Sequence, residues 1–250
     1  MSLQVDNLYF AYGSQDVLRG VSFQAEKGLC TAVLGINGAG KSTVLKCVGR
    51  IHQPREGTVR IGGKYLCEMD RSTVAKLIGY VPQSCELGEN TVFDAVLLGR
   101  KPYINWDITK EDLQIVERVL RTLKLEGFAM RNVRELSGGE RQKVSIARAL
   151  AQQAKVLLFD EPTSNLDLKN QLEVLQMIRD IVREQNLCAV ITIHDINLAL
   201  RFADRILMMK EGGVYDYGDT NVVTSRAIEE VYGVHVSVID HHGRKMIIPQ

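Results

Sequence analysis

The apolar residues of this chain follow different periods in different segments, and these periods predict its strands and helices. Near the start, Leu3 and Val5, and later Val21 and Phe23, alternate with polar residues. Alternation of this kind is typical of strands that bury one face only. We therefore expect residues 1–27 to form the edge of an antiparallel sheet.

Three later segments are apolar at nearly every position, namely residues 30–34, 156–159 and 189–193. Continuous apolar character is typical of parallel strands that are buried on both faces. Between the second and third segments, the spacing of a crossover helix is seen at Leu172, Leu175, Ile178 and Val182. The pattern predicts an α/β fold built on a parallel sheet.

Residues 86–152 interrupt this alternation with a helical pattern. Thr109 can cap a helix, and the apolar face of that helix carries Leu113, Val116, Val119, Leu120 and Leu123. We predict a single domain with three parts. These are a core of residues 1–85 and 153–225, a helical subdomain of residues 86–152, and a C-terminal appendage of residues 226–250.

Composition indicates a soluble intracellular protein without a nucleic-acid partner. The chain of 250 residues has 31 basic and 30 acidic residues, for a net charge of +1. No segment approaches the roughly 20 apolar residues that span a bilayer, and the N-terminus does not resemble a signal peptide. A role at a membrane would therefore require docking onto other subunits.

The cysteines and a histidine pair indicate neither disulfides nor a metal site. No C-x-x-C pair occurs among the five cysteines, which are Cys30, Cys47, Cys67, Cys85 and Cys188. We expect reduced thiols. His241 and His242 lie between two alternating segments, and this position predicts a polar hairpin turn.

A glycine-rich segment follows the first continuously apolar strand. It reads Gly35-Ile36-Asn37-Gly38-Ala39-Gly40-Lys41-Ser42-Thr43 and fits the pattern G-x-x-x-x-G-K-[ST]. Glycines let backbone N–H groups approach phosphate oxygens. Lys41 brings positive charge to the β- and γ-phosphates, Ser42 offers a hydroxyl to Mg²⁺, and Thr43 lies near the same phosphates. The following helix is predicted from Val44, Leu45, Val48 and Ile51. The alternative is a glycine-rich turn before a core helix.

A second segment, Leu136-Ser137-Gly138-Gly139-Glu140, begins another predicted helix. Ser137 can accept a hydrogen bond from the N–H of Glu140, and Glu140 can reach back, which defines a capping box. The start of a helix also favours an anion. One chain around one nucleotide needs only the first glycine-rich segment, so the presence of both suggests that two chains share two nucleotides. An ordinary helix start is the alternative.

The apolar strand at residues 156–159 ends in two carboxylates, Asp160 and Glu161. Ligands of α/β proteins bind at the C-terminal edge of the parallel sheet. Asp160 is placed to hold Mg²⁺ through water, and Glu161 is a candidate general base for an attacking water. The alternative is the start of an ordinary Asp-Glu-Pro loop.

Together these segments resemble the ATP-binding subunit of an ABC transporter over essentially the whole chain. The resemblance implies a P-loop NTPase (RecA-like) core with a parallel sheet, an N-terminal antiparallel β subdomain and an inserted α-helical subdomain. It implies hydrolysis of ATP with Mg²⁺, coupled to transmembrane transport. In the family, Gln83 matches a residue that touches Mg²⁺ and the attacking water. Asp167 matches a loop that crosses the dimer interface, and His194 matches the histidine that contacts the γ-phosphate.

The resemblance leaves some positions open. Tyr12 matches the residue that stacks on adenine, with Tyr9 and Phe10 as alternatives. Glu140 stands where glutamine is commonest, and Asn165 stands where alanine is usual. Both departures lie beside the key residues of their motifs, and we expect no loss of activity from them.

The resemblance also implies partners. These are a second copy in a head-to-tail dimer that sandwiches two ATP, transmembrane permease subunits, and indirectly a substrate-binding protein, with the chain on the cytoplasmic face of the membrane. Residues 91–103 and 231–234 resemble importers of metal chelates, namely iron–siderophore, haem and cobalamin systems. The alternatives are an ABC ATPase of another importer or exporter class, a non-transport ABC ATPase, a small-molecule P-loop kinase and a non-hydrolysing regulatory module.

Overall fold

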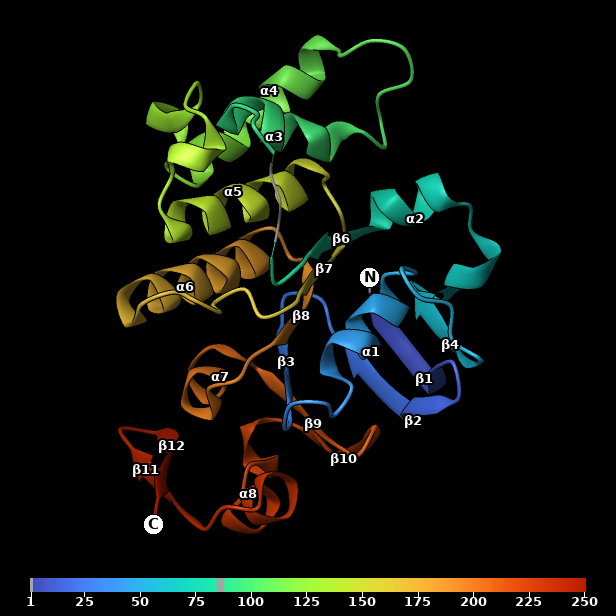
Figure 1. Ribbon diagram of the computed structural model, residues 1–250, viewed down its shortest axis with the longest axis vertical. Coiled ribbons are helices and arrows are strands. Elements are labelled where there is room, and N and C mark those ends of the chain that lie inside the picture. Colours follow the sequence, from blue (N-terminus) through green and yellow to red (C-terminus); the bar gives the residue numbers. More distant parts are fainter. Residues whose placement is uncertain (1, 85–87) are drawn as a thin grey trace.

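A six-stranded sheet with the order β10-β9-β3-β8-β7-β6 runs through the computed structural model, which describes residues 2–84 and 88–250 (Figure 1). Its strands are β3 (Cys30–Leu34), β6 (Ile78–Val81), β7 (Val156–Phe159), β8 (Cys188–Thr192), β9 (Arg205–Lys210) and β10 (Gly213–Gly218). Neighbouring strands from β9 to β6 are parallel, and β10 pairs with β9 in the antiparallel direction. The predicted α/β fold with a parallel sheet is confirmed.

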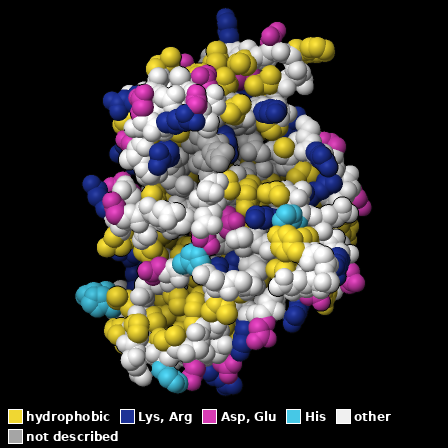
Figure 2. Space-filling view, in the orientation of Figure 1, with side chains coloured by type: hydrophobic (Ala, Val, Ile, Leu, Met, Phe, Trp, Pro, Cys, Tyr) yellow, Lys and Arg dark blue, Asp and Glu magenta, His cyan; other side chains and the backbone are white. Residues whose placement is uncertain are grey.

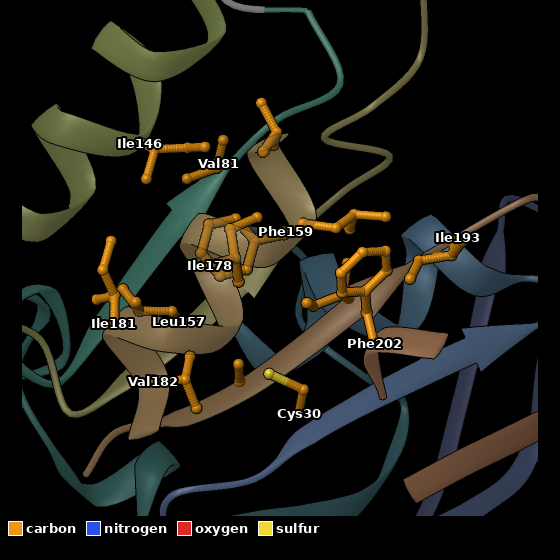
Figure 3. Packing of buried hydrophobic residues seen from close by; sticks show 14 of the residues in the cluster. Cys30, Val81, Ile146, Leu157, Phe159, Ile178, Ile181, Val182, Ile193 and Phe202 are labelled. Atoms are coloured by element: carbon orange, nitrogen blue, oxygen red, sulfur yellow. The ribbon is translucent and has the colours of Figure 1, made fainter. Parts of the chain in front are cut away.

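Alternate residues of the central strands enter two separate hydrophobic clusters. On β3, Cys30 and Leu34 belong to one cluster, and Val33 belongs to the other. The first cluster also contains residues of α5 (Gly138–Ala151), α6 (Leu168–Glu184) and α7 (Ile196–Phe202), and Figure 3 shows Phe159 and Ile178 within it. The second contains residues of α1 (Lys41–Val48) and the N-terminal sheet. Burial on both faces explains why these strands lack polar alternation.

The N-terminal sheet has the order β2-β1-β4-β5 and is antiparallel throughout. Its strands are β1 (Leu3–Tyr12), β2 (Gln15–Ala25), β4 (Glu56–Ile61) and β5 (Lys64–Tyr65). Leu3, Val5, Val21 and Phe23 are buried, as their alternation predicts. The short helix η1 (Leu66–Glu68) and α2 (Arg71–Leu77) connect this sheet to β6.

Between β6 and β7 the described chain is helical, and Figure 1 shows these helices beyond one end of the large sheet. The helices before α5 are α3 (Val92–Leu97), η2 (Leu98–Arg100), α4 (Lys110–Thr122), η3 (Glu126–Phe128) and η4 (Val133–Glu135). Thr109 caps α4 as predicted, because its Oγ1 accepts from the Asp112 N–H at 3.2 Å. Leu113 was expected on the buried face but is 37% exposed, since the helix turns Ile115 inward instead.

A buried ion pair joins three segments of this helical part. Arg100, which is 3% exposed, donates to Asp112 Oδ1 at 2.8 Å, to the carbonyl oxygen of Ala151 at 2.8 Å and to Gln153 Oε1 at 3.0 Å. Its guanidinium carbon also lies 4.0 Å from the centre of the Tyr103 ring. Arg100 thus ties η2 and α4 to the end of α5, close to where the chain enters β7.

Gly99, beside this arginine, allows close packing of η2 against α5. A Cβ added to Gly99 would lie 2.1 Å from the carbonyl oxygen of Arg148 and 3.1 Å from Cβ of Ala151. Any side chain here would force the two helices apart. The Gly-Arg pair, part of the segment resembling chelate importers, therefore has a packing role of its own.

The C-terminal part consists of η5 (Thr220–Val222), α8 (Ser225–Tyr232) and the hairpin β11 (Val236–His241) and β12 (Arg244–Pro249). The predicted polar turn is confirmed, although His241 is the last residue of β11 and only His242 and Gly243 lie between the strands. The hairpin packs on α7, where the Asn197 side chain accepts from the Ile247 N–H at 2.8 Å.

Some local expectations change with the structure. Ile51 was expected in the helix after the glycine-rich segment, but α1 ends at Val48 and Ile51 is 52% exposed. Arg50 has a φ of 53°, so the chain leaves the helical direction there. The expected boundary between residues 85 and 86 lies outside the described residues, and the division into three parts stays a prediction.

Four cysteines can be placed, and all four are free. Burial raises the pKa of Cys30, Cys47 and Cys188 to about 12, so these groups are thiols at neutral pH. Cys67 is exposed, and Cys85 lies outside the described residues. Within residues 2–84 and 88–250, every helix is too short or too polar to span a bilayer.

Candidate functional site

The glycine-rich segment forms a loop between β3 and α1. Gly35 has a φ of 150°, and a Cβ added to it would lie 2.5 Å from the carbonyl oxygen of Met209, so no larger residue fits. Gly38 has a φ of 84° and open space where a side chain would be. The Lys41 ammonium donates to the carbonyl oxygens of Gly35 at 2.9 Å and Ile36 at 3.0 Å. The lysine is therefore held at the centre of the loop.

The loop has one accessible side. Ile36, Asn37 and Gly38 are exposed, whereas Ala39, Gly40 and Thr43 are buried against the body of the protein. Gly40 has a φ of 96° and directly precedes α1. Backbone N–H groups at the start of a helix favour an anion, so the exposed side of the loop suits a phosphate chain.

Asp160, directly after β7, accepts hydrogen bonds from three hydroxyl groups. Its Oδ1 accepts from Ser42 at 2.7 Å and from Thr192 at 3.0 Å, and its Oδ2 accepts from Tyr80 at 3.0 Å. The carboxylate is 4% exposed. One carboxylate beside a hydroxyl, completed by substrate phosphates and water, is the usual protein environment of Mg²⁺, so Ser42 and Asp160 fit that ion.

Glu161 stands between two further residues that the sequence singles out. Gln83 Nε2 donates to its Oε2 at 2.5 Å, and His194 Nε2 lies 2.6 Å from its Oε1. The backbone of Glu161 has a φ of 48°, an uncommon value for a residue other than glycine. The structure thus brings Gln83, Glu161 and His194 together at the edge of the sheet, beside Asp160.

The electrostatic balance of this site involves one lysine and two carboxylates. Burial lowers the pKa of Lys41, and the carboxylates of Glu161 and Asp160 oppose this shift. Figure 2 shows acidic, basic and histidine side chains side by side near the middle of the viewed face. Such a site can bind a phosphate chain through Lys41 and polarise a water through Glu161.

Tyr12 is the most exposed of the three aromatic residues considered for adenine. It is 48% exposed, whereas Tyr9 is 37% exposed and Phe10 is 9% exposed. The Tyr12 hydroxyl lies 2.9 Å from His52 Nε2, and the ring of Phe10 stacks on His52 at 5.1 Å. The Tyr9 hydroxyl instead faces Gly20 of β2. A stacking role for Tyr12 stays a prediction.

The capping box predicted at the start of α5 is confirmed. Glu140 N–H donates to Ser137 Oγ at 3.3 Å, and Glu140 Oε2 accepts from the Ser137 N–H at 2.8 Å and from its hydroxyl at 2.7 Å. These hydrogen bonds from Ser137 lower the pKa of Glu140. Glu140, the departure from the commonest family residue, is therefore a charged cap that holds the Ser137 side chain.

The α5 start lies beside the start of α6, and Figure 1 shows these two helices side by side. A Cβ added to Gly139 would lie 2.9 Å from Asn170 Oδ1, and one added to Gly138 would lie 3.8 Å from Leu166. Asp167 caps α6 by accepting from the Asn170 N–H at 2.8 Å. The structure brings Gly138, Gly139 and Asp167 to one place, whereas the glycine-rich loop packs against β9 and β2.

The departure at Asn165 also has a structural reason. Asn165 has a φ of 64°, within the left-handed region, which asparagine adopts more readily than most residues. Leu166 N–H donates to the carbonyl oxygen of Thr163 at 3.3 Å, which closes the turn around it. The asparagine therefore suits the shape of the loop before α6.

Three residues at the site escaped the sequence analysis. Tyr80 and Thr192 bind Asp160, and the hydroxyl of Tyr232 accepts from the Gly35 N–H at 2.9 Å. Tyr80 and Thr192 are polar groups in otherwise apolar strands, and a buried polar group needs a partner. That signal could have identified both. Tyr232 ends α8, and nothing near it in the sequence points to Gly35.

The described chain matches known proteins over most of its length. A family model described as ABC transporter matches residues 18–164. An uncharacterized ABC transporter ATP-binding protein of Methanocaldococcus jannaschii is 47% identical over 100% of this chain and 98% of its own. An iron(3+)-hydroxamate import ATP-binding protein of Bacillus subtilis is 35% identical, covering 95% and 90%. A phosphonates import ATP-binding protein of Haloarcula marismortui is 35% identical, covering 95% and 92%.

Solved structures give the same picture. A transporter assigned to the metal-chelate ABC type, in an inward-facing conformation, superposes with a TM-score of 0.86 at 33% identity over 100% of this chain and 97% of that one. A dimeric ATP-binding cassette in a post-hydrolysis state with ADP and Pi has a TM-score of 0.74 at 29% identity, covering 87% and 98%.

Proposed function

The chain belongs to the ABC transporter family, and from this premise we propose that Glu161, His194 and Gln83 hydrolyse ATP to drive import of a metal chelate. One observation carries the assignment of residues. The Glu161 carboxylate lies between Gln83 and His194, next to the pair Ser42 and Asp160. The remaining steps follow from the chemistry of these groups.

The loop before α1 would bind the phosphates of ATP. The residues concerned are Gly35, Ile36, Asn37, Gly38, Ala39, Gly40, Lys41, Ser42 and Thr43. Backbone N–H groups and the Lys41 ammonium supply positive charge from one side. Ser42, Asp160 and Gln83 would hold Mg²⁺, which neutralises developing charge on the phosphate oxygens when bound. Oxygen donors of this kind suit that ion.

Glu161 would act as the general base. Its carboxylate can accept the proton of a water that attacks the γ-phosphate, and Gln83 and His194 hold that carboxylate by hydrogen bonds. His194 is exposed, so its ring can also reach the γ-phosphate. Holding an acceptor in a fixed direction lowers the barrier because less reorganisation is needed at the moment of reaction.

A second copy of the chain would complete each site in a head-to-tail dimer. Ser137, Gly138 and Asp167 are exposed and lie together at the starts of α5 and α6. The start of α5 can bind the γ-phosphate of the partner's nucleotide, as helix N-termini bind anions. Tyr12 would stack on adenine. The dimeric cassette with ADP and Pi supports this arrangement.

The permease and the cargo are the finer part of the proposal. A groove beside the site is lined by Arg71, Tyr80, Leu98, Pro102 and Gln152, among others. Leu98 is 51% exposed there, and the Tyr80 hydroxyl reaches Asp160. This groove suits a segment of the permease. The relative for iron hydroxamate and the chelate-type structure support a chelate as cargo, and a substrate-binding protein would deliver it.

Purified protein and proteoliposomes test the proposal in two steps. The chain alone should release phosphate from ATP in the presence of Mg²⁺. Phosphate release no faster than in the absence of the protein would overturn the assignment of the catalytic residues. Reconstituted with the permease from a neighbouring reading frame, it should drive uptake of an iron hydroxamate or cobalamin. If phosphonate were the only compound taken up, the chelate assignment would be wrong. The cargo would then be of the class named for the Haloarcula marismortui relative.

His194→Ala should lower ATP turnover strongly while ATP still binds. The ring supports the Glu161 carboxylate at 2.6 Å, and the loss of such a group costs about 10²-fold or more in rate. Phosphate release and titration with a fluorescent ATP analogue measure the two quantities. His242→Ala, in the exposed hairpin turn, is the matched control and should behave like wild type. Turnover near the wild-type rate in His194→Ala would contradict the role.

Tyr232→Phe should weaken ATP binding by several-fold with little change in the maximal rate. The substitution removes the acceptor of the Gly35 N–H, and an unpaired buried donor costs about 1–3 kcal/mol. Burial raises the pKa of Tyr232 to about 12, so it is a neutral phenol at working pH. The Kd for ATP is the measurement. Tyr215→Phe, on the exposed surface of β10, is the control; equal effects of both would argue against a loop-holding role.

A further inference from the structure

A buried hydroxyl in strand β8 binds both carboxylate residues of the site. We propose that Thr192 is a positioning residue that fixes the backbone of Glu161 relative to Asp160 and so aims the general base. The inference rests on the proposed function, because it concerns the same reaction. It adds a residue that none of the sequence motifs contains.

The Thr192 hydroxyl accepts one hydrogen bond and donates another. Its Oγ1 accepts from the Glu161 N–H at 2.7 Å and lies 3.0 Å from Asp160 Oδ1. A hydroxyl has one proton, and the carbonyl oxygen of Phe159 is at 3.5 Å, the limit of a hydrogen bond. The proton therefore goes to Asp160. Since Thr192 is 0% exposed, bulk water does not compete for these bonds.

This contact matters because the backbone of Glu161 has an uncommon conformation. Its φ of 48° lies in a region that residues other than glycine rarely adopt, and such conformations persist where surrounding structure enforces them. The N–H of Glu161 is held by Thr192, and its carbonyl oxygen accepts from Ser164 N at 3.1 Å and Ser164 Oγ at 3.0 Å. With both ends of the residue tied, the side chain leaves the backbone in one direction, toward Gln83 and His194.

The strand register explains why Thr192 can do this. Phe159 of β7 is paired with Ile191 of β8. The next residues along the two segments, Asp160 and Thr192, therefore lie side by side at the same edge of the sheet. His194 lies two residues further along the same segment. One strand end therefore positions the general base through its backbone and supports its carboxylate through the histidine. A change in β8 would move both supports together.

The experiment compares Thr192→Val, which keeps the shape but removes the hydroxyl, with Thr192→Ser, which keeps the hydroxyl. Thr31→Val is the matched control, because Thr31 is also 0% exposed, lies on the adjacent strand β3, and its Oγ1 has no hydrogen-bond partner among the described residues. Maximal rate, KM for ATP, half-saturation by Mg²⁺ and melting temperature are measured for each full-length protein.

Thr192→Val should lower the maximal rate about 10–100-fold, the effect of losing a buried hydrogen bond at a reacting group, while KM for ATP changes less than about 3-fold. Thr192→Ser should recover most of the rate, and Thr31→Val should match wild type. The Mg²⁺ concentration that gives half the maximal rate should rise in Thr192→Val only. In a Glu161→Gln background, Thr192→Val should add little further loss, because both act on one group.

A purely structural role would give a different result. Loss of rate in proportion to loss of melting temperature, or no recovery in Thr192→Ser, would overturn the inference. So would a full additional loss in the Glu161→Gln background. If Thr192→Val hydrolysed ATP at the wild-type rate while His194→Ala did not, only this inference would be wrong. Wild-type turnover of His194→Ala and Glu161→Gln would instead remove the proposed function.

Discussion

Glu161→Gln should strongly lower ATP turnover, to a residual rate that can still be measured, and leave an ATP-bound dimer that can be isolated. Glutamine keeps the size of the side chain but cannot accept the proton of the attacking water, and loss of a general base costs about 10²–10⁴-fold in rate. The loop around Lys41 is untouched, so ATP still binds. As long as the γ-phosphate remains, the closed state stays favoured. Sizing chromatography with ATP and Mg²⁺, together with phosphate release, measures both effects.

Two controls separate this outcome from a general loss of folding or binding. Glu184→Gln makes the same change at the exposed end of α6 and should retain wild-type turnover. Lys41→Ala removes the ammonium from the loop and should abolish the ATP-dependent dimer. A Glu161→Gln protein that remains monomeric at high protein and ATP concentrations would contradict the shared site.

Arg100→Ala should cause the largest loss of stability of the single substitutions considered. Arg100 and Asp112 have side chains 4% and 5% exposed, so removal of the arginine leaves a buried carboxylate without its cationic partner. Breaking a buried pair in this way costs about 3–5 kcal/mol. For a chain of this size, each kcal/mol lowers the melting temperature by about 2–4 °C. Thermal unfolding followed by circular dichroism should therefore show a fall of about 10 °C.

The chain supplies its own comparison pair. Arg134 forms an ion pair with Glu89 on the surface, with side chains 69% and 70% exposed. Arg134→Ala should cost about 1 kcal/mol or less, because solvent screens such pairs. A double replacement, Arg100→Met with Asp112→Leu, should recover much of the lost stability, since no buried charge remains. Equal melting temperatures for Arg100→Ala and Arg134→Ala would refute the argument.

The buried pair also has a defined pH dependence. Hydrogen bonds from Thr109, and then from Arg100, lower the pKa of Asp112 below its ordinary value of 3.8. A carboxyl with a lowered pKa in the folded state contributes stability above its ordinary pKa, and that contribution is lost as the pH falls through the folded value. The pair should therefore retain its full effect at neutral pH and fail only in strong acid.

Much of the fold could be predicted from local patterns. The strand at residues 30–34 has the expected bounds, because a continuous apolar run between turn residues leaves few alternatives. The caps Thr109 and Ser137 are also in place, since a cap depends only on residues three positions apart. The predicted end of the helix after the glycine-rich segment was wrong. Ile51 lies beyond α1, because helix ends respond to tertiary packing.

The contacts that complete the site could not be predicted in the same way. Gln83 and Glu161 are 78 residues apart, and their hydrogen bond exists only because β6 and β7 are neighbours in the sheet. The hydroxyls of Tyr80 and Thr192 meet Asp160 through the same strand order. Sequence spacing carries no information on which strands are adjacent, so family resemblance had to supply the placement of Gln83.

The hydrogen bond between Tyr232 and Gly35 spans 197 positions and has a practical consequence for anyone who shortens this protein. Deleting the chain from Ser225 onward would leave the phosphate loop near the other terminus without one of its supports. Nucleotide affinity should then drop even though every motif is still present. Shortened versions should accordingly keep α8, so that Tyr232 stays beside Gly35.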